Sequence, residues 1–87
     1  MPRFRKKPVV IEATQWWPGT AVDGVLDLTQ AQNITRDGQP MQAGAYVETL
    51  EGPMKVSPGD WIITDVAGEK YPCKDEIFRQ TYDLVEE

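Results

Sequence analysis

The chain has 87 residues, which is the size of one compact domain and too short for two. With 40% hydrophobic and 26% charged residues, its composition is that of a globular protein rather than a disordered one. Histidine is absent, and the chain has a single cysteine, Cys73, and a single serine, Ser57. These counts exclude a Cys/His zinc site, a disulfide framework, a CxxC pair and a Ser-His or Cys-His nucleophile.

The formal net charge of −5 is unevenly distributed along the chain. Residues 1–7, which we call the N-terminal arm, carry four of the nine basic residues: Arg3, Arg5, Lys6 and Lys7. The remaining residues, 8–87, have five basic residues against fourteen acidic ones, a balance of −9. An acidic body disfavours binding to double-stranded nucleic acid. The arm either pairs with this body and aids solubility, or contacts a phosphate.

The start of the chain has basic residues but no apolar run of about 7–15 residues behind them, so we expect no signal peptide. No apolar stretch approaches the roughly 18 residues of a membrane-spanning helix. Together with one unpaired cysteine, this predicts a cytosolic protein without a membrane partner.

The first predicted element is a strand over Val9–Trp16, with apolar residues on one face. Alternation along this strand points Trp16 and Trp17 to opposite faces, so one is expected in the core and the other at a surface, interface or ligand pocket. A short helix is expected after Thr20, because Val22, Val25 and Leu26 follow at helical spacing.

Residues 29–44 offer few apolar anchors. Asp37-Gly38 predicts a two-residue turn between short edge strands at Ile34–Arg36 and Gln39–Met41. A second, clearer hairpin is predicted from Ala45–Leu50 and Met54–Val56, with its turn at Glu51-Gly52-Pro53.

The last third of the chain predicts a turn, strands and one helix. Ser57–Asp60 has the Pro and Gly of a type II turn, and Trp61–Thr64 is apolar on both faces, as in a central strand. Lys70–Cys73 predicts a short strand, Lys74–Gln80 a helix with acidic residues at its start, and Tyr82–Val85 a final strand.

These elements predict a single domain over residues 1–87 with an α+β fold: a small, mainly antiparallel sheet or partly open barrel with one or two short helices. The edges of so small a sheet need cover, and a symmetric partner is a common one. We therefore expect a homodimer or a larger ring.

Two sets of residues are candidates for a chemical site. Cys73 has Lys74 beside it, which favours the reactive thiolate, but no histidine can act as its base, and a packing role is expected. Asp60 with Asp65 or Glu69 matches no cation-binding loop, and Asp60 is expected to stabilise its turn. No metal or cofactor is predicted.

The aromatic residues are the more informative group, because they are too many for a core of this size. An exposed tryptophan can stack on a base while an arginine or lysine binds phosphate. The predicted ligand-binding residues are therefore Trp17 and Trp61 with the basic residues of the arm: Arg3, Arg5, Lys6 and Lys7. The alternative is that these rings serve packing or self-association.

Three stretches resemble a family of small phage and prophage proteins: residues 5–16 (RKKPVVIEA-x-QW), residues 58–63 (PGDWII) and residues 68–82 (GE-x-YPCK and IF-x-x-TY). Residues 18–44 match no motif of this family. The resemblance implies a bacteriophage or prophage origin and a role in the host cytosol, and it supplies no catalytic residue.

We therefore expect a non-catalytic phage accessory protein that binds a ligand or a host component as a homo-oligomer. One version sequesters a small nucleotide signal in the evasion of host defence. The alternative is an acidic inhibitor of a host protein surface, and the remaining alternative is an enzyme that depends on Cys73.

Overall fold

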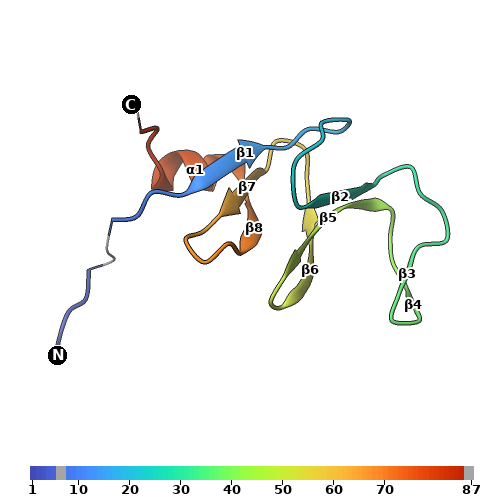
Figure 1. Ribbon diagram of the computed structural model, residues 1–87, viewed down its shortest axis with the longest axis horizontal. Helices are drawn as coiled ribbons and strands as arrows, with labels where there is room; N and C mark the ends of the chain where they lie inside the picture. Colours follow the sequence, from blue (N-terminus) through green and yellow to red (C-terminus); the bar gives the residue numbers. More distant parts are fainter. Residues whose placement is uncertain (6–7, 86–87) are drawn as a thin grey trace.

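The computed structural model describes residues 1–5 and 8–85, and in these residues it has an α+β fold of small antiparallel sheets with one short helix (Figure 1). The first sheet has the order β1-β7-β8 and the second the order β2-β5-β6, while β3 and β4 form a two-stranded hairpin. Their bounds are β1 Glu12–Gln15, β2 Val25–Leu28, β3 Thr35–Arg36, β4 Gln39–Pro40, β5 Gly44–Thr49, β6 Gly52–Val56, β7 Trp61–Thr64, β8 Lys70–Cys73 and α1 Asp75–Thr81.

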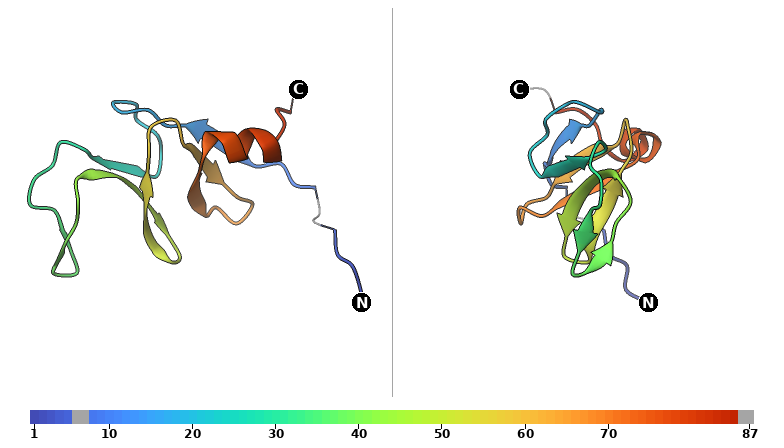
Figure 2. Two further views of the ribbon diagram at one scale, coloured as in Figure 1. Left: turned by 180° about the vertical axis from the view of Figure 1, so that it is seen from behind. Right: turned by 90° about the vertical axis from the view of Figure 1, so that its right-hand side faces the viewer.

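The two three-stranded sheets form two halves of the molecule, with α1 beside the first sheet and the β3–β4 hairpin at the far end of the second (Figures 1 and 2). β7 lies in the centre of its sheet, as its two apolar faces predicted. Its successive isoleucines point to opposite sides: Ile62 belongs to the core cluster, and Ile63, with no exposed surface, lies on the other face of the strand.

The core between the sheets is small. It consists of Trp16 and Ile62 from the first sheet region, Val22 from the following loop, and the second-sheet residues Ala45, Val47 and Val56. Trp16 is 1% exposed and Trp17 is 50% exposed, which confirms that only one of the two tryptophans is in the core. The indole Nε1 of Trp16 is buried without a hydrogen-bond partner among the described residues.

The predicted turns at residues 37–38 and 57–60 are confirmed, whereas the turn between β5 and β6 lies at Leu50 and Glu51, because Gly52 and Pro53 already pair with β5. Asp37 and Gly38 both have positive φ values, 50° and 78°, as a two-residue turn between β3 and β4 requires. In the turn at residues 57–60, the Asp60 N–H donates to the Ser57 carbonyl at 3.0 Å, and Gly59 has φ +90°.

Three predicted elements were wrong or too long. No helix follows Thr20: Gly24 has φ +89°, which a right-handed helix does not accommodate, and β2 begins at the next residue. Tyr82–Val85 is not a strand, because no strand pairs with it. The first strand begins at Glu12 rather than Val9. No helix among the described residues is long and apolar enough to span a membrane.

Candidate functional site

A groove of about 610 Å³, lined mainly by apolar residues, lies on the α1 side of the first sheet. Ala13 and Trp61 contribute from the sheet, Phe78 and Arg79 from α1, and residues 9–11 and 82–85 from the two ends of the described chain. Val10 and Leu84 are 71% and 89% exposed, so this groove continues into an exposed apolar surface. Contiguous apolar surface of this kind is typical of binding sites.

Three aromatic rings form one side of the groove. The rings of Trp61 and Phe78 are stacked, with centroids 4.2 Å apart and planes inclined by 10°. Tyr82 follows one helical turn later, with its ring 5.1 Å from that of Phe78. Tyr82 is the residue that caps the C-terminal end of α1, and its ring continues the aromatic side that Phe78 begins.

Polar contacts hold α1 in this position. The Trp61 indole Nε1 donates to Asp75 Oδ1 at 2.8 Å, and Arg79 Nε donates to both oxygens of the same carboxylate at 3.0 Å. The hydrogen bond from Trp61, followed by the contacts of Arg79, lowers the pKa of Asp75 below its usual value. Arg79, the cationic residue that lines the groove, is thus already engaged by a carboxylate.

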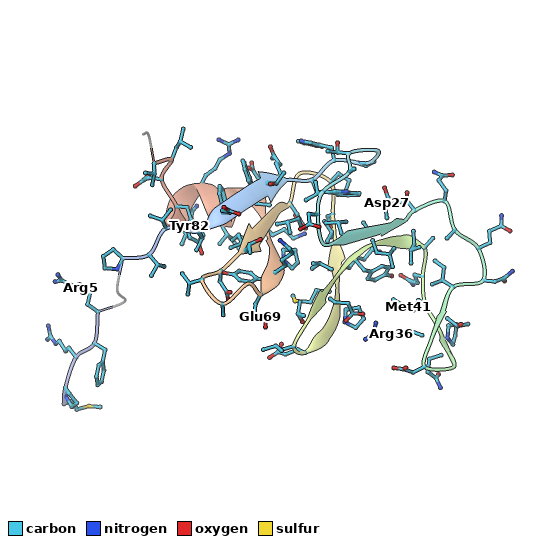
Figure 3. All side chains as sticks on the ribbon, in the orientation of Figure 1. Arg5, Asp27, Arg36, Met41, Glu69 and Tyr82 are labelled. Carbon is cyan, nitrogen blue, oxygen red and sulfur yellow. The ribbon has the colours of Figure 1, made fainter. Side chains whose placement is uncertain are left out.

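The structure does not gather the predicted ligand-binding residues into one site. Trp61 lines the groove, but one face of its indole is covered by Phe78. Trp17 lies elsewhere, over the turn, where a Cβ at position 59 would lie 3.4 Å from its ring. Arg3 and Arg5 are exposed on the extended N-terminal segment, and neither lines the groove; Figure 3 shows Arg5 well away from Tyr82. Lys6 and Lys7 lie outside the described residues.

Asp60 stabilises its turn, as the sequence indicated. Its side chain is buried, and its Oδ2 accepts the backbone N–H of Ser57 at 2.9 Å. The Lys74 ammonium lies 3.5 Å from Asp60 Oδ1 and 3.4 Å from the Ser57 hydroxyl. This arrangement ties the start of α1 to the turn that precedes β7.

Cys73 is not activated by its neighbour. Burial, together with the nearby negative charge of Asp60, raises the pKa of the Cys73 thiol above its usual value. The ammonium of Lys74 is directed toward Asp60 instead. Lys74 therefore does not promote the thiolate, because the carboxylate of Asp60 counters the lysine and the thiol is partly desolvated.

The other carboxylates considered as a cation site are Asp65 and Glu69, and Asp65 has a local structural role. Asp65 Oδ1 accepts the backbone N–H groups of Ala67 and Glu69, each at 2.9 Å, which closes the loop between β7 and β8. Among the described residues, no group of three or more Cys, Asp or Glu side chains is arranged to hold a metal ion.

A second, smaller hollow of about 170 Å³ lies between the β3–β4 hairpin and the outer face of the second sheet. Its rim is crossed by an ion pair between Arg36 and Glu48. We regard this hollow as part of the packing of the hairpin.

Sequence reasoning missed most of the groove. The spacing of Phe78 and Tyr82 was a usable signal, but Tyr82 was assigned to a strand and not to the end of α1. The approach of residues 9–11 to residues 82–85 had no local signal, because it depends on tertiary contacts between opposite ends of the chain.

Comparison of the chain with protein-family models, curated proteins and solved structures finds no match.

Proposed function

We propose that the protein is a small non-catalytic binding protein that takes an apolar side chain or short segment of a host protein into the groove over Trp61, Phe78 and Tyr82, and that it acts as a homo-oligomer. The single observation that carries this proposal is the groove itself, which is apolar and opens onto exposed Val10 and Leu84. The resemblance to phage and prophage proteins supports a site of action in the cytosol of an infected host.

The charge of the chain favours a partner with basic residues around the apolar anchor. Residues 8–87 carry a balance of −9, and Asp83 lies in the wall of the groove. Opposite charge on the partner raises the association rate and makes binding sensitive to salt. The proposed function is therefore that of an acidic inhibitor of a host protein surface, as the sequence suggested, with the groove as its binding site.

A nucleotide ligand is less well supported by the groove. Phosphate recognition needs several free donors, usually Arg, Lys or backbone N–H groups. Arg79 is the basic residue in the groove lining, and the carboxylate of Asp75 already engages it. The arm residues Arg3 and Arg5 do not contribute to this wall.

The proposal is tested by affinity capture from host lysate with three versions of the protein as bait. Val10→Glu places a charge in the groove, and Val66→Glu is the matched control, because Val66 is 78% exposed in the β7–β8 loop, away from the groove. We expect a host protein that is retained by the wild type and by Val66→Glu, lost with Val10→Glu and released by salt.

Capture that does not distinguish the two variants contradicts the groove as the binding site. Calorimetric titration with cyclic dinucleotides and ADP-ribose is the second arm of this test. Heat of binding from a nucleotide that is abolished by Arg3→Ala with Arg5→Ala, but not by Val10→Glu, favours the nucleotide version instead.

A further inference from the structure

The chain exposes more surface than a compact monomer of its mass. Its accessible area is 7234 Å², whereas a folded monomer of 9.8 kDa is expected to expose about 5200 Å². The radius of gyration is 15.3 Å, against about 12 Å for a compact domain of this length. The extended N-terminal segment accounts for part of the excess (Figure 1). A standard interface covers roughly 800 Å² of each partner, which this surface can supply.

The outer edge of β1 has backbone groups available for pairing. β1 is an edge strand that pairs with β7. The backbone of Trp16 bonds toward the β7 side, through its N–H to Asp60 and through its carbonyl to Gly59, both at 2.8 Å. Because backbone groups alternate in direction along an antiparallel strand, those of Gln15 and Ala13 point away from β7.

The opposite edge of this sheet is protected. β8 contains Pro72, which has no N–H to donate, and β8 also lies against β5 and β6 of the second sheet. β1 contains no proline, and the extended residues 9–11 prolong its open edge. An open edge of this kind is a template for pairing with another strand.

We propose that two copies of the chain pair antiparallel through β1, around a two-fold axis at Ala13, and so form a continuous six-stranded sheet. This specifies the interface of the homo-oligomer in the proposed function and rests on it. Charge favours an axis at Ala13 over one at the preceding residue. An axis at Glu12 would place two glutamates directly opposite each other, whereas an axis at Ala13 places Glu12 opposite Thr14 of the second copy.

The charge segregation of the chain fits this arrangement. In an antiparallel pair, the described basic residues of the arm, Arg3 and Arg5, lie on the side of the Gln15 end of the other copy. The segment beyond that end carries Asp23 and Asp27, both exposed. Figure 3 shows Asp27 in the half of the molecule away from Arg5, and a second copy brings acidic residues of this half toward the arm.

The register is tested by changing the charge at position 14, which is exposed. Thr14→Lys places a lysine opposite Glu12 twice in each dimer, and Thr14→Glu places a glutamate there. Because a cross-strand charge pair contributes roughly 0.2–1 kcal/mol, sedimentation equilibrium should show a dimer Kd that falls about two- to thirtyfold for the lysine and rises by a similar factor for the glutamate. The double variant Glu12→Lys with Thr14→Glu should restore dimerisation.

A second measurement locates the axis. At a two-fold axis, the two Cα atoms of a hydrogen-bonded pair lie about 5.5 Å apart, within reach of a disulfide. In a Cys73→Ser background, Ala13→Cys should give a disulfide-linked dimer on mild oxidation, and Val66→Cys should not. Circular dichroism establishes that each variant is folded.

A wild-type chain that sediments at 9.8 kDa at high micromolar concentration overturns both the β1 interface and the homo-oligomer. A wild-type dimer whose Kd responds equally to Thr14→Lys and Thr14→Glu, or that gives no cross-link through Ala13→Cys, overturns the β1 interface and leaves the homo-oligomer standing. Host-protein capture through the groove is measured separately and does not depend on either result.

Discussion

The docking of α1 depends on Phe78, and truncating this side chain tests the structure of the groove. Phe78→Ala removes the ring that stacks on Trp61 at 4.2 Å and contacts Tyr82 at 5.1 Å. Each aromatic pair contributes about 0.5–1.5 kcal/mol beyond the area that it buries, so the two pairs contribute about 1–3 kcal/mol. Phe78 is only partly buried, and we therefore expect a total loss near 3 kcal/mol, the lower end of Phe→Ala substitutions.

Ile77 provides the matched control on the same helix. It is 56% exposed and lies outside the aromatic stack, so Ile77→Ala should change the free energy of unfolding by less than about 0.5 kcal/mol. A chain of 87 residues is expected to have a stability of about 4–13 kcal/mol, of which the Phe78 loss is a large fraction. Urea unfolding followed by far-ultraviolet circular dichroism gives both values. Equal effects of Phe78→Ala and Ile77→Ala would refute docking of α1 through the stack.

Three further predictions address the thiol, a partly buried phenol and a turn. Because the pKa of Cys73 is raised in the folded chain, its alkylation by iodoacetamide at pH 8 should be slower than in the same chain unfolded in urea. Burial and the neighbouring phenol of Tyr82 raise the pKa of Tyr71 from 10.0 to about 12, so the unfolded chain loses this proton at a lower pH than the folded chain does. The stabilisation is fully present below pH 10 and should be lost between pH 10 and 12. In urea unfolding, the midpoint should therefore fall over this pH range, and Tyr71→Phe should reduce that fall. Gly59→Ala, at φ +90°, should cost about 1–2 kcal/mol, whereas Gly44→Ala, at an ordinary φ, meets the flexible end of a lysine and should cost less in the same assay.

Local signals predicted the turns and the central strand correctly. Asp37-Gly38 and the turn at residues 57–60 depend on φ values that few residues adopt, so the sequence itself carries the information. Trp61–Thr64 was identified because both of its faces are apolar, and both faces are covered in the structure.

Elements that depend on tertiary partners were harder to predict. Val22, Val25 and Leu26 have helical spacing, but Gly24 adopts φ +89° and the chain enters β2 instead. Tyr82 has the extended backbone of a strand, φ −124° and ψ 143°, yet it ends α1, because its ring packs on Phe78 and no strand lies beside it.

The residues of the candidate site were likewise only partly predictable from local signals. The sequence indicated Trp61, because eight aromatic residues exceed what a small core can hold. It also grouped Trp61 with Trp17 and the arm, since nothing local shows that these residues lie at different places. The groove forms where residues from both ends of the chain meet, and only the fold brings them together.

The proposed interface and the proposed groove are linked by geometry. A two-fold axis perpendicular to the six-stranded sheet keeps the same face of both copies on one side, so both helices and both grooves open in the same direction. A partner with two apolar segments then binds both grooves, with the second contact made at a high effective concentration. Thr14→Glu should therefore weaken binding of such a bivalent partner while leaving the affinity for a single isolated segment unchanged. Equal losses for the bivalent and the monovalent partner would place the effect of Thr14→Glu within the groove and not at the β1 interface.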